Sequence, residues 1–155
     1  MPIRNIDKIY GVLPKQGRLM GLDLGKKTIG IAVSDVSRTI ATPRTTILRG
    51  KFKKDAITLL KLVESEGVVA IVIGLPLNMN GSEGPRSQST RQFAENLSEK
   101  TSVFITFWDE RLSTIAATRT MIEANLSRKR QKDVVDKIAA AFILQGAIDF
   151  LNRKG

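Results

Sequence analysis

One carboxylate lies inside an otherwise apolar predicted strand, and it constrains what this chain can fold into. Asp23 stands between Leu22 and Leu24, so in a strand the two leucines face one side of the sheet and Asp23 faces the other. Burying a carboxylate costs free energy unless it meets a cation or several hydrogen-bond donors. Gly25 and Gly30 follow, and glycine lets another backbone, a phosphate or a metal ion come close. This pattern is typical of a metal-dependent enzyme that acts on phosphate groups.

The composition limits which chemistry and which partners are open to the chain. Its 155 residues include no cysteine and no histidine, which excludes thiolate nucleophiles, a histidine base and zinc–thiolate sites. A metal site must therefore use Asp and Glu oxygens. No apolar run reaches the roughly 18 residues of a membrane span, and we expect a cytoplasmic protein with no membrane partner. The net charge of +10 favours a polyanionic partner, above all nucleic acid.

Basic residues are concentrated in two segments. One is a short run formed by Arg128, Lys129, Arg130 and Lys132. The other is the amino-terminal segment, which contains Arg4, Lys8, Lys15 and Arg18. Residues 1–17 show no hydrophobic period and include prolines and a glycine, so we predict an extended leader there. A single domain is predicted over residues 18–155.

Five predicted strands are apolar or rich in β-branched residues and are bounded by turn residues. They cover residues 18–24, 28–34, 39–48, 68–73 and 103–108. The first two form a hairpin, and Pro43 favours an edge position for the third. The fourth is apolar throughout, which is typical of a strand buried on both faces.

Four predicted helices follow or separate the later strands. They cover residues 52–66, 85 to about 100, 113 or 114 to 124, and 133 to about 150. Gly67 ends the first helix and Pro85 begins the second, and the basic run is predicted as a loop before the last. A hairpin followed by alternating helices and strands predicts an α/β fold with a mixed five-stranded sheet flanked by helices.

Three acidic residues stand at strand ends or among apolar neighbours, namely Asp23, Glu110 and Asp136. Carboxylates that converge repel one another unless a divalent cation lies between them, so we expect Mg²⁺ or Mn²⁺ at such a site. Simpler roles are open for two of them. Asp136 would also favour a helix amino terminus, and Glu110 could form a surface ion pair with Arg111. Asp109, next to Glu110, is an alternative ligand at the same strand end.

Candidate substrate contacts are basic or polar residues near the ends of predicted strands and helices. They are Lys26, Lys27, Asn78, Arg86, Arg111, Ser113 and Thr114, together with the run Arg128, Lys129, Arg130 and Lys132. Arg111 could clamp a phosphate through two parallel hydrogen bonds, and the helix that begins at Pro85 offers free N–H groups to an anion. Lys27 could equally be a solvated hairpin tip, and Ser113 or Thr114 a helix cap.

The ordered set of motifs resembles the bacterial YqgF family, also called RuvX. The matching segments are GLDLGKKTIGIAVSD at 21–35, VIGLPLNMNG at 72–81, GPR at 84–86, WDERLST at 108–114 and DKIAAAFILQ at 136–145. The family's members are described as pre-16S ribosomal RNA nucleases and as Holliday-junction resolvase-like. The resemblance implies an RNase H-like fold. It also implies a catalytic, metal-binding site of Asp23, Glu110 and Asp136.

The expected function is metal-dependent endonuclease activity on structured RNA. The leading hypothesis is processing of the 5′ end of pre-16S rRNA during ribosome biogenesis. Resolution of four-way DNA junctions is the alternative within nucleases. Two further classes are open: a sugar-kinase or actin-like ATPase, whose phosphate loops resemble the Asp-Leu-Gly turn, and a ribosome-assembly factor that binds RNA without cutting it. We expect a monomer or a weak homodimer.

Overall fold

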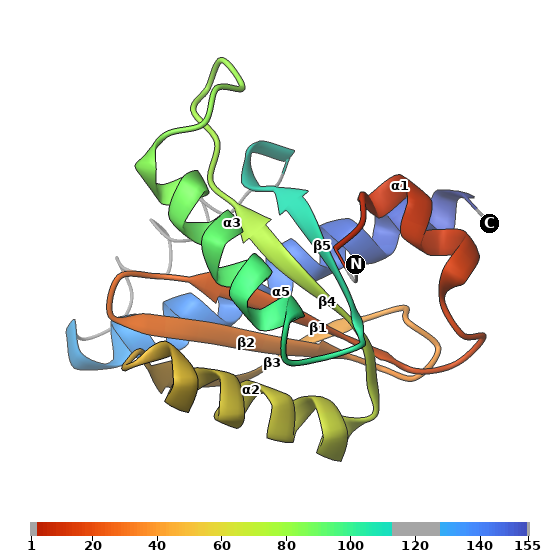
Figure 1. The fold of residues 1–155 in the computed structure, drawn as a ribbon, viewed down its shortest axis with the longest axis horizontal. Coiled ribbons are helices and arrows are strands. Elements are labelled where there is room, and N and C mark those ends of the chain that lie inside the picture. Colours follow the sequence, from red (N-terminus) through yellow and green to blue (C-terminus); the bar gives the residue numbers. More distant parts are fainter. Residues whose placement is uncertain (1–2, 113–127, 155) are drawn as a thin grey trace.

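Five strands form one mixed sheet at the centre of the molecule (Figure 1). The computed structural model describes residues 3–112 and 128–154, without the side chains of residues 128–133 and 154. The strands are β1 (Arg18–Leu24), β2 (Thr28–Ser34), β3 (Ala41–Leu48), β4 (Val68–Leu75) and β5 (Phe104–Asp109). Their spatial order is β3-β2-β1-β4-β5. β1, β4 and β5 are parallel, and β2 is antiparallel to both neighbours, which confirms the predicted mixed sheet.

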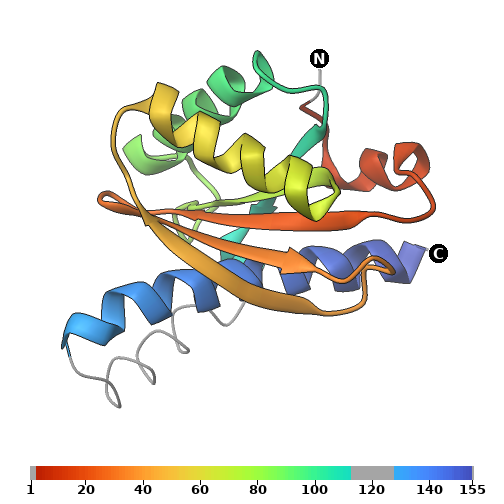
Figure 2. The same ribbon diagram turned by 90° about the horizontal axis from the view of Figure 1, so that it is seen from below.

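Helices cover both faces of this sheet (Figure 2). α2 (Phe52–Glu66) and α3 (Pro85–Ser98) lie on one face, and the long helix α5 (Arg128–Lys154) crosses the other. α2 ends as predicted, because Gly67 takes a left-handed φ of 65° and closes the last turn. Pro85 occupies the first turn of α3, also as predicted. No helix within residues 3–112 and 128–154 is long and apolar enough to cross a membrane.

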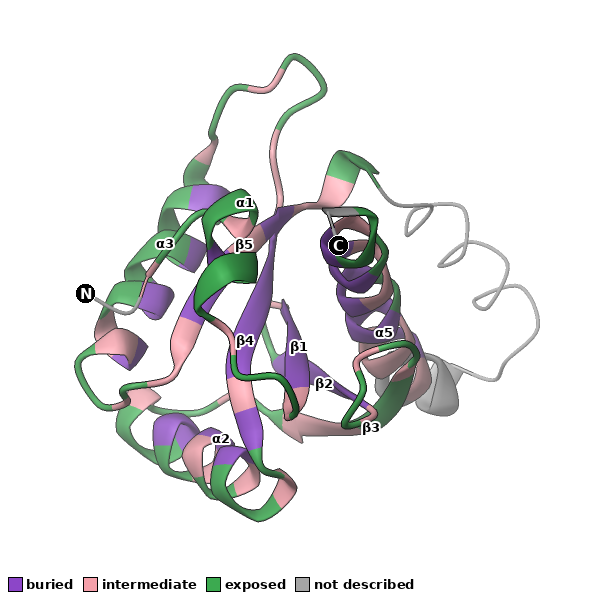
Figure 3. Cartoon of the chain, turned by 90° about the vertical axis from the view of Figure 1, so that its right-hand side faces the viewer, coloured by how far each residue is buried: buried purple, intermediate pink, exposed green. Residues whose placement is uncertain are grey.

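Alternation of side chains along β1 separates two hydrophobic layers. Leu19 packs with residues of α5, whereas Met20 and Leu22 pack with residues of α2 and α3 on the opposite face. The same alternation places Asp23 on the α5 face. Both β1 and β2 are buried along almost their whole length (Figure 3), so Asp23 lies on a covered face of the sheet.

Glycines let α5 approach the sheet closely. A side chain at Gly21 would place its Cβ 2.7 Å from the Cβ of Leu144, and one at Gly30 would collide with the backbone carbonyl of Asp136. Leu144 and Asp136 both belong to α5. With any other residue at these two positions, the helix would have to lie farther from β1 and β2.

β3 forms one edge of the sheet, as Pro43 predicts. Proline has no N–H to donate to a further strand, so it is tolerated at an edge. The pairing of β3 with β2 also shifts register between Ile31 and Ala32, beside Pro43. Such an irregularity bends the strand and increases its twist.

The prediction of an extended leader is wrong for residues 6–12, which are helical. Ile3 forms a parallel bridge with Ile105 of β5, and the chain then forms α1 (Ile6–Ile9) and a 3₁₀ turn, η1 (Tyr10–Val12). Ile9 is buried in the layer under α5. A single helical turn is too short to show a hydrophobic period, so no pattern in the sequence marks this anchor. The domain boundary at residue 18 stays a prediction.

The basic run is helical, and the predicted loop is wrong. α5 begins at Arg128, so the backbone of residues 128–132 belongs to this helix and Asp133 is not its first residue. Arg, Lys and Gln are good helix formers, and no Gly or Pro interrupts the run. The helix predicted over residues 113–124 lies outside the described residues.

The close packing of α5 predicts a stability effect at Gly30. In Gly30→Ala the added Cβ forces α5 away from β2, and such overpacking typically costs about 1–3 kcal/mol of the free energy of unfolding. Gly11→Ala is the matched control, because no atom lies within 4 Å of the Cβ added there. Urea unfolding should show a lowered midpoint for Gly30→Ala alone. Equal midpoints for the two variants would contradict the close packing.

Candidate active site

The parallel strands β1, β4 and β5 have their carboxyl ends on the same side of the sheet, and acidic residues lie there. Asp23 is the last residue but one of β1 and is 2% exposed. Glu110 follows β5 directly, in the 3₁₀ turn η2 (Glu110–Leu112). Open α/β sheets bind their ligands beyond the carboxyl ends of the strands. This edge is therefore the candidate active site.

Asp23 lies between two glycines of the neighbouring strands. On β2 it pairs with Gly30. On β4 the register that pairs Leu22 with Ile73 makes Gly74 the next neighbour of Asp23. Neither glycine carries a side chain, so both flanks of Asp23 are open to groups from outside the sheet.

The other two acidic residues lie against these glycines. The backbone carbonyl of Asp136 lies over Gly30, and Oε1 of Glu110 lies 2.7 Å from the position that a Cβ of Gly74 would take. Asp23, Glu110 and Asp136 come from β1, η2 and α5. The fold therefore brings one acidic residue to each side of Asp23.

Asp136 is held by a hydrogen bond that crosses the fold. The hydroxyl of Thr28, at the start of β2, donates to Oδ2 of Asp136. Because α5 begins at Arg128, Asp136 lies in the interior of the helix, and stabilisation of a helix amino terminus does not explain it. Sequence reasoning missed this role of Thr28. The two residues are 108 positions apart, so no local signal could have found the pair.

Asp109, next to Glu110, is bound by Arg111. Arg111 binds Asp109 through both carboxylate oxygens, with Nη2 2.6 Å from Oδ2 and Nε 3.1 Å from each oxygen. The backbone N–H of Arg111 also donates to Asp109 at 2.9 Å. These donors hold the pKa of Asp109 below its usual value. Glu110, which lies over Gly74, is therefore the better candidate ligand at this strand end.

The loop between β4 and α3 is shaped by its own polar groups. Asn78 donates from Nδ2 to the hydroxyl of Ser82 at 2.9 Å, and its backbone N–H donates to the carbonyl of Ser82 at the same distance. Arg111 reaches this loop too, since its Nη1 lies 3.2 Å from the carbonyl oxygen of Met79. Asn78 therefore closes the loop on itself, and Arg111 ties the loop to η2.

Several cations lie around the site. Nη2 of Arg86 is 3.4 Å from the carbonyl oxygen of Leu24, the residue after Asp23. Lys26 and Lys27 are exposed at the tip of the hairpin between β1 and β2.

Arg49 was not predicted, and it belongs to the same group of cations. Its Nη1 donates to the carbonyl of Gly25 at 2.6 Å, and its guanidinium lies 5.4 Å from the ring centroid of Phe93. The sequence offers no local signal for Arg49, because it reaches the hairpin from the end of β3, 24 positions away.

Some predicted contacts lie beyond what the structure describes. Ser113 and Thr114 are outside the described residues. Arg128, Lys129, Arg130 and Lys132 are placed on α5 by their backbone, but their side chains are not described. Their roles stay predictions.

The acidic residues suit a hard divalent ion in chemistry. Asp23, Glu110 and Asp136 offer carboxylate oxygens alone, which Mg²⁺ and Mn²⁺ prefer. Within the described part of the chain, no three acidic side chains lie close enough together to hold a metal ion. The carboxylate of Asp136 accepts a hydrogen bond from the hydroxyl of Thr28. Metal binding stays a prediction that the donor set supports.

Solved structures with a similar arrangement include Holliday-junction resolvases. RuvC of Thermus thermophilus, solved with a Holliday-junction substrate, matches 82% of this chain and 91% of its own, with a TM-score of 0.52 and 12% identity. The yeast mitochondrial Holliday-junction resolvase matches 96% of this chain and 86% of its own, with a TM-score of 0.50 and 12% identity. The fold is therefore the RNase H-like fold of RuvC-like resolvases, as predicted.

The sequence comparisons identify the family within this fold. Residues 17–150 match the model of RuvX, described as Holliday junction resolvase. A relative from Rhodobacter capsulatus is 58% identical over 150 residues, 97% of this chain and 94% of its own. One from Paracoccus denitrificans is 54% identical over 155 residues, 100% of this chain and 98% of its own. Both are named "Putative pre-16S rRNA nuclease". The chain belongs to the RuvX family, which confirms the resemblance and the class of nuclease.

The ion pair at η2 predicts a pH effect on stability. Arg111 lowers the pKa of Asp109 from its usual 3.8, so the ionised carboxylate stabilises the folded chain. This contribution to stability is complete above the pKa that Asp109 has in the unfolded chain. It is lost as the pH falls through the lower pKa that Asp109 has in the folded chain. Between about pH 6 and about pH 3, the free energy of unfolding should therefore fall less in Asp109→Asn than in the wild type.

Urea unfolding at the two pH values measures this effect. Asp149→Asn, at an exposed acidic position on α5, is the control. A wild-type pH dependence in Asp109→Asn would show that the ion pair does not stabilise the fold.

Proposed function

We propose that this protein is a metal-dependent endonuclease that hydrolyses phosphodiester bonds of structured RNA, at the 5′ end of pre-16S rRNA. The observation that supports it most is the position of Glu110 and Asp136 against the glycines that flank Asp23. Three acidic residues placed this way on a basic protein suit a polyanionic substrate that is cut with the help of a divalent ion. The names of the relatives point to the RNA.

Asp23, Glu110 and Asp136 would hold Mg²⁺ or Mn²⁺ at the edge of the sheet. A bound ion of this kind lowers the pKa of a water molecule and stabilises the leaving oxygen. Thr28 would fix the orientation of Asp136, since its hydroxyl donates to that carboxylate. The burial of Asp23 keeps its carboxylate in place and restricts access of bulk water.

The surrounding cations would bind the phosphates of the strand. Arg86 and Arg49 are held by carbonyl groups beside the end of β1, so their guanidinium groups are already oriented. Lys26 and Lys27 at the hairpin tip would add charge without fixed geometry. The basic run at 128–132 would extend this surface along α5.

Junction DNA is the second candidate substrate. The family description and the T. thermophilus RuvC complex with its Holliday-junction substrate favour it. A dimer with two suitably spaced sites would suit a junction. A factor that binds RNA without cutting it fits less well, because acidic residues at a phosphate-binding site repel the phosphates and weaken binding.

Cleavage by Asp23→Asn is the direct test. The change keeps the shape of the side chain but removes a charged oxygen that a hard ion requires, so we expect cleavage to fall at least about a hundredfold. Purified protein would be assayed with Mn²⁺ on a pre-16S rRNA fragment and on a four-way DNA junction. Asp149→Asn, exposed on α5, should cut at the wild-type rate. Wild-type turnover by Asp23→Asn would exclude this residue as a ligand, and cutting of the junction alone would favour the second candidate.

A metal should also stabilise the folded protein. Residues 23, 110 and 136 are far apart in the chain, so the unfolded state cannot assemble the site. A ligand that binds only the folded state stabilises it by about 2.7 kcal/mol at a hundredfold excess over its dissociation constant. Mg²⁺ or Mn²⁺ should therefore raise the melting temperature of the wild type, and the shift should shrink in Glu110→Gln. A melting temperature that ignores both ions at millimolar concentration would contradict the metal site.

A further inference from the structure

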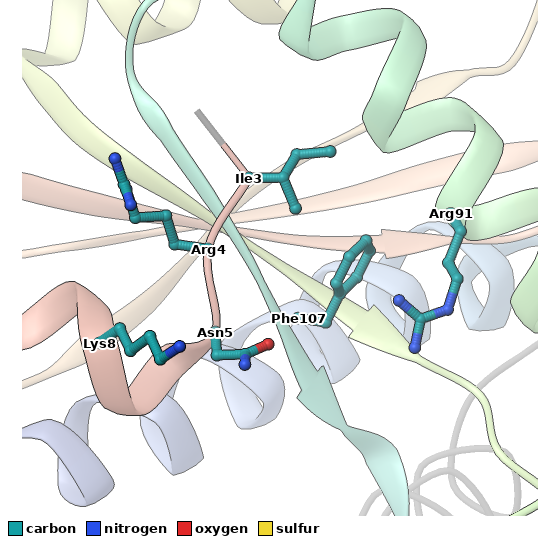
Figure 4. A pocket seen from close by; sticks show the side chains of 6 residues that line it. All are labelled: Ile3, Arg4, Asn5, Lys8, Arg91 and Phe107. Atoms are coloured by element: carbon teal, nitrogen blue, oxygen red, sulfur yellow. The ribbon is translucent and has the colours of Figure 1, made fainter. Parts of the chain in front are cut away.

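The amino-terminal segment and the free edge of β5 enclose a basic pocket that the proposed active site does not use. Its volume is about 260 Å³. It is lined by Ile3, Arg4, Asn5, Lys8, Arg91 and Phe107 (Figure 4). We propose that this pocket binds a backbone phosphate of the nucleic-acid substrate, on a stretch of strand that runs past the active site. The proposal rests on the proposed function.

The pocket exists because the leader pairs with only part of β5. Ile3 bridges Ile105, and the backbone N–H of Arg4 donates to the carbonyl of Ile105 at 2.9 Å. The chain then turns away into α1 after Asn5. Backbone groups of alternate residues point to the same side of a strand, so those of Phe107 face the same edge as those of Ile105. Within the described residues, no backbone group pairs with Phe107 at this edge, and the space beside it is open.

The charge of the lining is positive. Among the described residues, Arg4 and Lys8 have no carboxylate partner. The guanidinium of Arg4 lies 5.7 Å from the ring centroid of Phe104. The guanidinium of Arg91 lies 5.0 Å from the ring centroid of Phe107 and pairs with Glu83 at 2.6 Å.

The pocket continues into an adjoining cavity of about 440 Å³, which shares Asn5, Arg91 and Phe107 with it. Asp7 lines that cavity and is the one acidic residue among its lining. Thr106 lines it too, and its side chain is fully buried. Within the described part of the chain, the hydroxyl of Thr106 has no hydrogen-bond partner. A buried hydroxyl without a partner costs free energy.

These groups suit a phosphodiester. Arginine and lysine bind phosphate oxygens through charge-assisted hydrogen bonds, and the amide of Asn5 adds a neutral donor. Phe107 stands three residues before Glu110, which is about 10 Å along an extended strand. A nucleic-acid strand bound at the acidic residues can therefore reach the pocket by crossing the edge of β5.

The test compares two double variants with equal net charge. Arg4→Gln with Lys8→Gln removes the two unpaired cations of the pocket. Lys53→Gln with Lys54→Gln removes two exposed cations of α2 and is the matched control. The probe is a fluorescein-labelled single-stranded RNA with the sequence of the 5′ end of pre-16S rRNA, measured by fluorescence anisotropy without divalent ions over a range of salt concentrations.

We expect the pocket variant to bind several-fold more weakly than the control variant. Its affinity should also depend less on salt, by about 0.7 in the logarithmic slope for each lost phosphate contact. Since the acidic residues are untouched, cleavage by the pocket variant should show a raised KM and an unchanged kcat. Arg4→Lys, which keeps the charge, should retain most of the binding.

Three outcomes would overturn the pocket as a phosphate site. The first is equal affinity and equal salt slope in the pocket and control variants. The second is weaker binding with an unchanged slope and a lowered melting temperature, which would make Arg4 and Lys8 structural. The third is competition by polyglutamate as strong as by unlabelled RNA, which would indicate a general polyanion surface. If the wild type neither binds nor cuts nucleic acid, the proposed function itself fails, and the two failures are thereby distinguished.

Discussion

The rest of the structure depends on how closely α5 packs against the sheet. Gly21 and Gly30 remove the side chains that would hold the helix off β1 and β2. Protein interiors are packed as densely as organic crystals, so a helix seated this way has little freedom to slide. The contact over Gly30 is made by the backbone of Asp136 itself. The packing that stabilises the fold thus also sets where one of the proposed catalytic carboxylates lies.

Features that depend on neighbours in the sequence could be predicted from it. Asp23 alternates with leucines, so its face of the strand followed from the pleat alone. The bounds of α2 followed from a helical period with glycine at its end, and the start of α3 from proline. Pro43 marked the edge strand because a missing N–H is a local property. Asp23 could be named as a candidate because its place between two leucines is one that solvation does not explain.

Features that depend on distant residues could not be predicted. The hydrogen bond from Thr28 to Asp136 and the reach of Arg49 to Gly25 join segments that only the folded chain brings together. The choice between Asp109 and Glu110 depended on where Arg111 points, which is a matter of side-chain geometry. The helical turns of the leader could not be predicted, because its one fully buried residue, Ile9, belongs to no repeating pattern. The start of α5 was missed because charge alone does not end a helix.

The two edges of the sheet are kept from open-ended association in different ways. An unpaired strand edge offers N–H and C=O groups to any other extended chain. At β3, a proline and a shift of register make that edge a poor template. At β5, the chain's own amino-terminal residues occupy the first part of the edge through the Ile3–Ile105 bridge. The leader therefore leaves fewer unpaired backbone groups at this edge for a second copy of the chain to pair with.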